Sequence, residues 1–383
     1  MTLTLALVAT GAASLAAWLA VLVAPLRPWD LRPIAEDEPP PQPPTAWPSV
    51  RVLVPARNEA RYLPRTLPAL LGQDYEGDWG VVLVDDRSHD RTSSIARALA
   101  GDHLTALEGD PLPADWLGKV WALDQGRQAA GLPDYFLLTD ADILHAPGSL
   151  RQLIAESEAN DLVLSSRMAR LRASTAPERL LIPPFLFFFN LLYPMRVVND
   201  PRKRLAAAAG GCVLVERGAL ERTGGFAAIR GEVIDDVSLA RRVKRAGGRI
   251  RLMVSRSDVV SLREYGSIAA VWRMVRRSAF DQLGYSWLLL AGTVLALALL
   301  FAVPPALFLL AAAGYESGGW HVAIGSIGGA AWLLMAALFA PTVRYFGLPR
   351  GWALTLPVAG LMFGAMTVDS ALRHAFRRPQ RWS

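Results

Sequence analysis

The sequence of 383 residues holds a single cysteine, Cys212, so a disulfide within the chain is excluded. One cysteine without a CxxC or CxxH partner also lacks the ligand spacing of a zinc site. We expect Cys212, which follows Gly210 and Gly211 in the sequence, to be a small packed residue. This sparse use of cysteine agrees with a reducing compartment.

The sequence also lacks a concentrated run of basic residues. Lysine and arginine number 40 against 34 acidic residues, for a net charge of +6, but they are scattered through the polar region and beside apolar runs. A segment that binds nucleic acid usually gathers its basic residues in one patch. We therefore expect no nucleic-acid partner and attribute the excess positive charge to the flanks of membrane segments.

Charged residues are missing from four long apolar runs near the two ends of the chain. A helix needs about 20 apolar residues to cross roughly 30 Å of hydrocarbon, so these runs predict membrane segments. The first run, within residues 1–26, lacks the basic start and the cleavage site of a secretory signal, and we interpret it as a retained anchor. The C-terminal region 285–370 holds the other three, at about 287–313, 318–340 and 352–368.

The arginines beside these runs predict their orientation. The positive-inside rule assigns to the cytosol the loops that carry Arg27, Arg32, Arg344 and Arg350. Four full crossings would place the basic tail, residues 371–383, on the outer side, against the same rule. We therefore expect the shortest run, 352–368, to be re-entrant or interfacial, and a full crossing is the alternative.

Between the apolar ends the composition becomes mixed and charged. Residues 27–48 are rich in proline and acidic residues, and we expect an extended linker that does not pack. In residues 49–284, apolar runs alternate with amphipathic stretches, which predicts an α/β fold with a mostly parallel, Rossmann-like sheet and helices on both faces. The predicted strands are 49–56, 80–86 and 135–140, and the predicted helices are 59–71, 92–100 and 147–158.

Polar side chains follow the predicted strands, at the edge where a doubly wound sheet binds its ligands. They are Arg57, Asn58, Glu59, Asp85, Asp86, Asp140 and Asp142. Asp140 and Asp142 stand two positions apart, so both carboxylates can aim at one point as the chain turns. Hard oxygen ligands of this kind suit Mg²⁺ or Mn²⁺. The alternative is that these aspartates only end a strand and cap the next helix.

A further apolar segment, residues 180–193, lies inside the polar region. It is too short to span a bilayer comfortably and contains Pro183, Pro184 and Asn190. We interpret it as an interfacial or substrate-facing segment. A buried core helix is an equal alternative on length alone.

Several short motifs follow one another in a fixed order. They are PARNEA, VDDRSHDRT, LGKVWALDQG, TDAD, GGCVLVERGAL and IDDVSLARRVKRAG. With these motifs, residues 50–284 resemble the family 2 glycosyltransferases. The resemblance implies a GT-A fold, a nucleotide-sugar donor, most simply UDP-linked, and a divalent metal.

The resemblance also implies roles for residues on the donor side. Pro55, Arg57 and Glu59 would border the base and ribose, Asp85 and Asp86 would bind the base, Lys119 would face the diphosphate, and Asp140 and Asp142 would hold the metal. Two plainer interpretations remain open. Asp85 and Asp86 could have a purely structural role, in a turn or as a helix cap. Lys119 could be a solvated surface residue.

On the acceptor side, Asp235 and Asp236 match the acidic pair of the family, and Asp236 falls where its catalytic base lies. A carboxylate base takes the proton of the acceptor hydroxyl as the oxygen attacks the anomeric carbon, which inverts its configuration. The alternative is that the two acidic residues only stabilise the N-terminus of the helix that follows. Gly210 and Gly211 resemble the small-residue turn beside the acceptor, although a plain tight turn uses glycine equally.

Lipid-modifying and polymerising members of the family carry, on an interfacial helix, a glutamine or arginine, two further residues, and then arginine followed by tryptophan. Arg273 and Arg276 match the arginines, but Arg277 stands where tryptophan is expected. The resemblance implies that Arg276 contacts the diphosphate and that Arg273 lies on the acceptor side. A basic helix resting on anionic lipid is an equal alternative.

The whole arrangement is most similar to the hopene-associated glycosyltransferases of bacterial hopanoid clusters. This similarity implies a bacterial inner-membrane enzyme with a cytosolic catalytic domain and a hopanoid acceptor. The alternatives are another lipid acceptor, such as a ceramide, a carotenoid or a polyprenyl phosphate, or a membrane scaffold that keeps the fold without the reaction.

Overall fold

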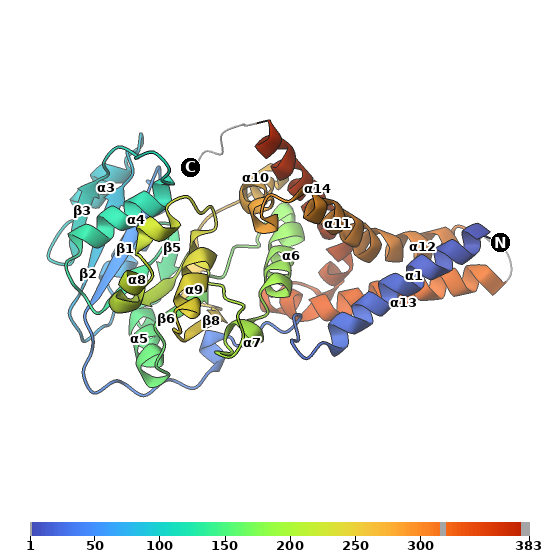
Figure 1. Ribbon diagram of the computed structural model, residues 1–383, viewed down its shortest axis with the longest axis horizontal. Coiled ribbons are helices and arrows are strands. Elements are labelled where there is room, and N and C mark those ends of the chain that lie inside the picture. The colour runs from blue at the N-terminus through green and yellow to red at the C-terminus, as the bar shows by residue number, and fades with distance from the viewer. Residues whose placement is uncertain (1, 315–318, 377–383) are drawn as a thin grey trace. The chain divides into compact units, whose positions relative to one another are not determined.

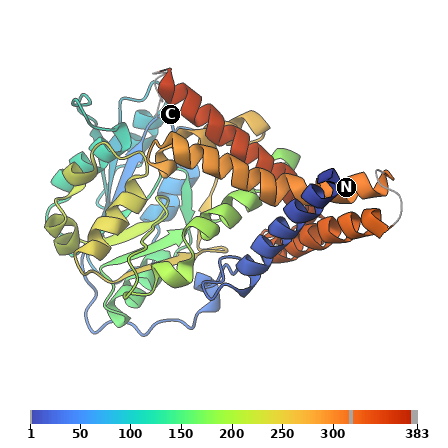
Figure 2. The ribbon, with the colours of Figure 1, turned by 45° about the vertical axis from the view of Figure 1, so that its right-hand side comes forward.

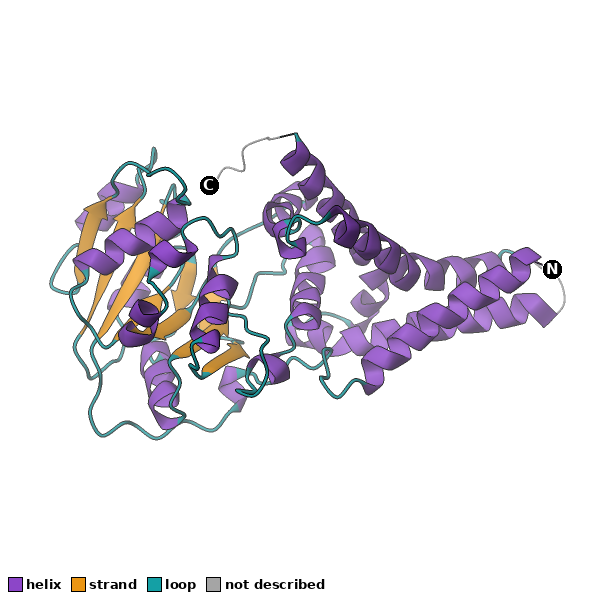
Figure 3. Cartoon of the chain, viewed as in Figure 1, coloured by secondary structure: helices purple, strands orange, loops and turns teal. Residues whose placement is uncertain are grey.

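The computed structural model describes residues 2–314 and 319–376, and the chain divides into two compact units. The sheet unit contains residues 32–172 and 195–264, and it holds all the strands drawn in Figure 3. Of the described residues, the helical unit contains 2–31, 173–194, 265–314 and 319–376. Residues 173–194 and 265–284, which the sequence analysis included in the α/β domain, therefore group with the helical unit.

The sheet unit is built on one sheet in the order β3-β2-β1-β4-β7-β6-β8. Only β7 runs antiparallel to its neighbours, so the expected mostly parallel α/β sheet is confirmed. Its strands are β1 (Val50–Ala56), β2 (Trp79–Asp85), β3 (Leu104–Glu108), β4 (Tyr135–Leu138), β6 (Leu164–Met168), β7 (Val213–Glu216) and β8 (Ile250–Val254). Its helices are α2 (Leu63–Leu71), α3 (Thr92–Ala98), α4 (Gly118–Ala129), α5 (Ser149–Ala159), α7 (Met195–Val198), α8 (Arg217–Arg222) and α9 (Asp235–Arg245), with the short turns η1 (Ala35–Asp37) and η2 (Phe226–Ile229).

Continuous apolar strands form here because both faces of the sheet are covered. Alternate residues of β1 point to opposite faces: Val52 and Val54 share a core cluster with Leu67 of α2. On the other face, Gly126 of α4 approaches Leu53, which a β-carbon at Gly126 would meet at 3.5 Å. Figure 1 shows α4 lying across β1 and β2.

A small second sheet pairs β5 (Ile143–His145) with β9 (Val259–Ser261) in antiparallel register. Ile143 lies opposite Ser261, and the Leu262 N–H donates to the carbonyl oxygen of Asp142 at 2.9 Å. The register therefore brings the residues after β9 beside the aspartates that precede β5.

The segment 27–48 is not wholly an unpacked linker. Ile34 forms a β-bridge with Val254, and the next residues make the turn η1. The Glu36 Oε1 atom accepts hydrogen bonds from the backbone N–H groups of Arg256, Ser257 and Asp258 at 2.7–2.9 Å. The sequence analysis missed this contact because the loop that supplies the three donors lies about 220 residues further along the chain.

Five helical segments among the described residues are long and apolar enough to cross a membrane, by length and composition alone, and they lie in the helical unit except for the short helix α7 that ends one of them. The elements of the helical unit are α1 (Thr2–Val23), α6 (Ala176–Leu192), α10 (Ile268–Ser278), η3 (Asp281–Leu283), α11 (Trp287–Leu297), the π-helical turn η4 (Ala298–Ala302), α12 (Val303–Ala312), α13 (Gly319–Tyr345), η5 (Arg350–Thr355) and α14 (Leu356–Ala375). Helices α1, α12 and α13 pack side by side, as the views of Figures 1 and 2 agree.

Besides the four predicted apolar runs, α6 also belongs to a segment of membrane-spanning length, although residues 180–193 alone were expected to be too short. With the short helix that follows, it extends from Ala176 to Val198, and 61% of its most apolar window is buried inside the chain. Its side chains pack against other helices of the unit, as Phe187 does against Phe339 with ring centroids 5.4 Å apart. The buried-helix alternative therefore describes this segment better than an exposed interfacial one.

The last helix is also longer than the apolar run 352–368 suggested. Helix α14 continues to Ala375 and includes the charged residues Asp369 and Arg373. Asp369 accepts hydrogen bonds from Trp272 at 2.8 Å and from Arg276 at 3.2 Å, both on α10. Shortness is thus no longer a reason for this segment to be re-entrant, and its topology stays a prediction. The tail beyond Phe376 lies outside the described residues.

The contacts of Glu36 give a pH-dependent expectation. Although burial opposes it, the N–H groups of Ser257 and Asp258 and the Ser255 hydroxyl lower the pKa of Glu36 from 4.5 to about 2. A carboxylate with a lowered pKa stabilises the fold above its unfolded value and loses that contribution as the pH falls toward the folded value. We expect Glu36→Gln to lower the stability by about 1–2 kcal/mol at pH 7. The difference should shrink between pH 4.5 and 2 in thermal unfolding of the purified chain.

A matched control is Asp37→Asn. Asp37 pairs with Arg256 at 2.8 Å, but half of its side chain is exposed. An exposed pair contributes little, so this variant should unfold within about 0.5 kcal/mol of the parent protein. Equal losses in the two variants would contradict a specific role for Glu36.

Candidate functional site

A recess opens at the carboxyl ends of the central strands. Its lining includes Pro55 at the end of β1, Thr139 and Asp140 after β4, Lys119 in the first turn of α4, Gly210 before β7, and Asp235 and Asp236 at the start of α9. Residues that are far apart in the sequence meet here because parallel strands end at the same edge of a sheet.

Lys119 is the cation at the centre of this recess. Its Nζ atom lies 3.0 Å from Asp140 Oδ1 and 3.5 Å from Asp235 Oδ2. Burial alone would lower the pKa of Lys119, but Asp140, Asp235 and Asp236 together raise it above its ordinary value, so the ammonium stays charged. The solvated-surface interpretation of Lys119 is therefore wrong, because only 19% of its side chain is exposed.

Asp236 is held by the backbone. Its Oδ2 atom accepts a hydrogen bond from the Gly210 N–H at 2.6 Å, and its Oδ1 atom accepts one from the Val237 N–H at 2.8 Å. Burial and the neighbouring charge of Asp235 raise the pKa of Asp236 to about 6, although Lys119 acts in the opposite direction. The result is an oriented carboxylate that can take up a proton near neutral pH.

Gly210 leaves room for this arrangement. A β-carbon at Gly210 would lie 2.9 Å from Lys119 Nζ and 3.2 Å from Asp236 Oδ2. Gly211 is also in a crowded position, because a β-carbon there would lie 3.1 Å from the Ile143 side chain. Both glycines therefore permit a close approach of backbone to side chains, which is more than a tight turn requires.

The ends of β1 and β2 bring together a second group of polar residues. Ala56 pairs with Asp85 in the sheet, so the next residues of the two strands are neighbours, and Arg57 Nη1 lies 3.0 Å from Asp86 Oδ2. Asp86 is buried, whereas Arg57 keeps a third of its side chain exposed. Asp85 Oδ1 accepts a hydrogen bond from the Ser88 N–H at 3.1 Å, so the turn interpretation applies to Asp85.

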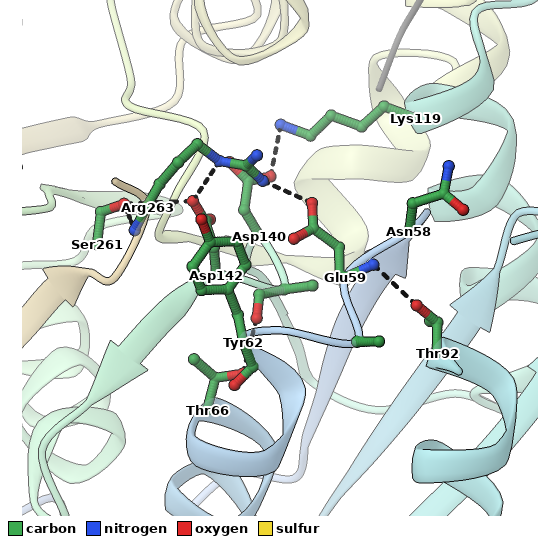
Figure 4. A network of polar contacts seen from close by, with 12 residues as sticks. Asn58, Glu59, Tyr62, Thr66, Thr92, Lys119, Asp140, Asp142, Ser261 and Arg263 are labelled. Carbon is green, nitrogen blue, oxygen red and sulfur yellow. Dashed lines mark hydrogen bonds and ion pairs between the residues drawn. The ribbon is translucent and has the colours of Figure 1, made fainter. Parts of the chain in front are cut away.

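Asp142 and Glu59 share one arginine that the sequence analysis did not identify. Arg263 Nε lies 2.7 Å from Asp142 Oδ2, and Arg263 Nη2 lies 2.5 Å from Glu59 Oε1. Dashed lines in Figure 4 mark both contacts. Burial raises the pKa of Glu59 to about 7, against the opposing charge of Arg263. The other oxygen of Glu59, Oε2, is buried without a hydrogen-bond partner among the described residues.

The loop that carries the two aspartates is fixed at several points. The Thr66 hydroxyl on α2 donates to the Ala141 carbonyl oxygen at 2.7 Å, between Asp140 and Asp142. The Thr139 hydroxyl donates to the Gly211 carbonyl oxygen at 2.9 Å, which ties the same loop to the glycine turn. These contacts hold the backbone of residues 139–142 between α2 and the glycine turn.

The two aspartates therefore face different surroundings. Asp140 keeps 40% of its side chain exposed and lines the recess, whereas Asp142 keeps 7% and points to Arg263. Within residues 2–314 and 319–376, no group of three acidic, histidine or cysteine side chains has the arrangement of a metal site. The donor chemistry still fits a hard divalent cation, since Asp140, Asp142 and the unpartnered Glu59 oxygen all offer carboxylate ligands.

The two arginines predicted to contact the diphosphate and the acceptor lie in the helical unit. Arg273 and Arg276 are both on α10, where Arg273 is exposed and Arg276 pairs with Asp369 at 3.2 Å. Arg263 could not be recognised in the sequence, because it is one of 40 basic residues and belongs to no motif. Its only signal was an arginine two residues after the short run Val259–Ser261.

Comparison with known proteins adds an independent finding. Residues 51–224 match the model of the family described as glycosyl transferase family 2. A 4,4'-diaponeurosporenoate glycosyltransferase from Staphylococcus haemolyticus is 34% identical over 95 residues, 25% of this chain and 24% of the relative. An N-acetylglucosaminyltransferase from Mesorhizobium japonicum is 32% identical over 158 residues, 39% of this chain and 34% of the relative. The chain thus spans about a quarter to a third of the length of these relatives.

A solved structure extends the likeness to the fold of nearly the whole chain. A mannosyltransferase from Pyrobaculum calidifontis, in complex with GDP-Man and Mn²⁺, covers 97% of this chain and 100% of its own, with a TM-score of 0.56 and 21% identity. The shared architecture is the GT-A fold, as the sequence analysis expected.

The hydrogen bond from Thr66 offers a test of how the aspartate loop is held. Replacing Thr66 with valine keeps the shape but leaves the buried Ala141 carbonyl without its donor, which costs about 1–3 kcal/mol. We expect Thr66→Val to lower the melting temperature and to speed hydrogen exchange in residues 140–145. Thr223→Val is the matched control, because the Thr223 hydroxyl donates at 2.8 Å only to Leu220 of its own helix end. Faster exchange of the aspartate loop in both variants would refute this anchoring role.

Proposed function

We propose that this chain, whose residues 51–224 match the family 2 glycosyltransferase model, transfers a sugar from a nucleotide-sugar donor to a hydroxyl group of a membrane lipid. The reaction inverts the anomeric configuration. The observation that carries the proposal is the recess at the carboxyl ends of the strands, where Lys119 and Asp140 face Asp236. Such a site combines a cation for a departing diphosphate with a carboxylate that can accept a proton.

The donor occupies the β1 and β2 side of the recess. Pro55, Arg57 and Glu59 border the base and ribose, and Asp86 binds the base with Asp85 beside it. The support is geometric, since the register of the two strands places Arg57 against Asp86 at the ligand edge of the sheet. We propose a uridine diphosphate sugar as the donor.

The diphosphate lies toward Lys119. The ammonium of Lys119 stabilises the charge that develops on the leaving nucleoside diphosphate, and its aspartate neighbours keep it charged. Asp140 and Asp142 would hold Mg²⁺ or Mn²⁺, which supplies further positive charge at the same leaving group. Arg276 on α10 is proposed as an additional diphosphate contact.

Asp236 is the proposed general base. The hydrogen bonds from Gly210 and Val237 orient its carboxylate, and a pKa of about 6 leaves it deprotonated at neutral pH and still basic enough to act. It takes the proton of the acceptor hydroxyl while the oxygen forms a bond to the anomeric carbon. The bond from that carbon to the diphosphate oxygen breaks, and the nucleoside diphosphate leaves from the opposite face. Asp235 supports this step through its contact with Lys119.

The acceptor is proposed to be a lipid because the chain carries five apolar helical segments of membrane-spanning length within its described residues. Gly210, Gly211 and Arg273 would lie on the acceptor side. A hopanoid is the proposed acceptor. A carotenoid is the second candidate, since the Staphylococcus haemolyticus relative is named for diaponeurosporenoate. We propose that the enzyme resides in the bacterial inner membrane with the sheet unit in the cytosol.

Two substitutions separate the proposed roles. Asp142→Asn should weaken the binding of Mn²⁺ and of UDP together, because it removes a metal ligand. Asp236→Asn should leave UDP affinity within about twofold and lower turnover by 100-fold or more, because the base acts only in the transition state. Isothermal titration with UDP and Mn²⁺, combined with a sugar-transfer assay, measures both effects.

Two outcomes would count against these assignments. Equal losses of UDP affinity in the two variants would contradict the division of roles. If the parent protein neither binds UDP in the presence of Mn²⁺ nor consumes any nucleotide sugar, a non-catalytic scaffold that keeps the fold would replace the enzyme.

The acceptor is tested in the cell. We expect a strain that lacks this chain to lose a glycosylated hopanoid and to accumulate its unglycosylated precursor, as measured by lipid mass spectrometry. Complementation with the Asp236→Asn variant should not restore the product, whereas the parent chain should. Loss of a glycosylated carotenoid with unchanged hopanoids would select the second candidate instead.

A further inference from the structure

The cation that contacts Asp142 in this structure is Arg263. Its Nε atom lies 2.7 Å from Asp142 Oδ2, while Nη2 of the same guanidinium lies 2.5 Å from Glu59 Oε1. Both carboxylates are largely buried, with 7% and 11% of their side chains exposed. One guanidinium therefore contacts two largely buried carboxyl groups.

The chain builds this contact through the small sheet. Ser261 lies opposite Ile143, and the Leu262 N–H donates to the Asp142 carbonyl oxygen, which fixes the next residue, Arg263, beside the Asp142 side chain. The Ser261 hydroxyl adds a hydrogen bond to the same Oδ2 atom at 3.3 Å. The guanidinium carbon of Arg263 lies 5.4 Å from the centroid of the Tyr62 ring. Arg263 is thus held by backbone register rather than by chance contact of a surface side chain.

An arginine and a metal ion compete for the same oxygen. A divalent cation needs direct coordination at 2.0–2.6 Å, which the donor hydrogens of a guanidinium on that oxygen obstruct. Two cations placed around one buried carboxylate also repel each other. Glu59 offers the arginine a second anchor, so Arg263 can leave Asp142 without losing all of its partners.

We propose that Arg263 is a resident counter-cation of Asp142, a positioning residue that keeps this side chain aligned and that a divalent metal must displace. The proposal rests on the function proposed above. It implies that the free protein binds Mn²⁺ more weakly than its carboxylates alone would allow. Stable metal binding then depends on the diphosphate of the donor, which brings additional oxygen ligands and negative charge.

The test measures Mn²⁺ binding without turnover. Purified full-length protein in detergent is titrated with Mn²⁺ in the absence of nucleotide, and the free ion is followed by electron paramagnetic resonance. We expect Arg263→Gln to bind Mn²⁺ more tightly than the parent protein, by on the order of tenfold, because an opposing charge beside Asp142 is removed. A merely structural role for Arg263 predicts the opposite sign, since a damaged site binds metal more weakly.

Arg61→Gln is the matched control. Arg61 also lies over the Tyr62 ring, at 5.8 Å, and pairs with Glu264, but it has no contact with Glu59 or Asp142 among the described ion pairs. It should bind Mn²⁺ like the parent protein. If Arg263→Gln does not fold, Arg263→Lys takes its place, because an ammonium cannot bridge both carboxylates with the arginine geometry, and it should bind Mn²⁺ with intermediate affinity.

Unchanged or weaker Mn²⁺ binding by the Arg263 variant, with a normal Arg61 variant, would overturn the proposal. In the double variant Asp142→Asn with Arg263→Gln, the gain in affinity should disappear. The outcome is separable from the proposed function. Sugar transfer by the parent protein without tighter metal binding in the Arg263 variant rejects only the counter-cation, whereas tighter binding without any sugar transfer rejects only the enzyme.

Discussion

The register of the parallel strands beside β1 is the constraint on which the site depends. Val50 pairs with Trp79 of β2 and with Tyr135 of β4, so the three strands run in step and end at one edge of the sheet. Neighbouring strands lie only about 4.8 Å apart, and the residues that follow them are therefore forced close together. A shift of one residue would turn each buried side chain to the opposite face and separate Arg57 from Asp86.

The strand ends bring several carboxylates close together, and two cations each contact a pair of them. Lys119 lies between Asp140 and Asp235, and Arg263 lies between Asp142 and Glu59. Partly buried carboxylates at such short spacing repel one another, and a cation between them offsets both the repulsion and the loss of hydration. The same arrangement prepares the edge of the sheet for a charged ligand, because a phosphate can take the place of a carboxylate beside a cation and a metal ion can take the place of a cation beside a carboxylate.

The helical unit shows how charge is accommodated in an apolar surrounding. Asp369 lies in α14 and is surrounded by donors from Trp272 and Arg276 on α10 and from Arg373 one turn along its own helix. An acidic residue in an apolar helix requires such partners, because an unpaired charge there is costly. The amphipathic helix α10 is thereby tied to α14, which no pattern within either segment predicts.

The sequence by itself determined the α/β sheet, the strand ends that carry Asp86 and Asp140, and most of the apolar helices, because each follows from a local pattern of apolar residues. It did not determine the partner of Asp142, the packing of Glu36, or the burial of α6. Asp142 and Arg263 are 121 residues apart, and only the antiparallel pairing of β5 with β9 brings them together. Local periodicity records which face of an element is apolar, whereas the tertiary structure decides which distant element covers that face and which charges meet there.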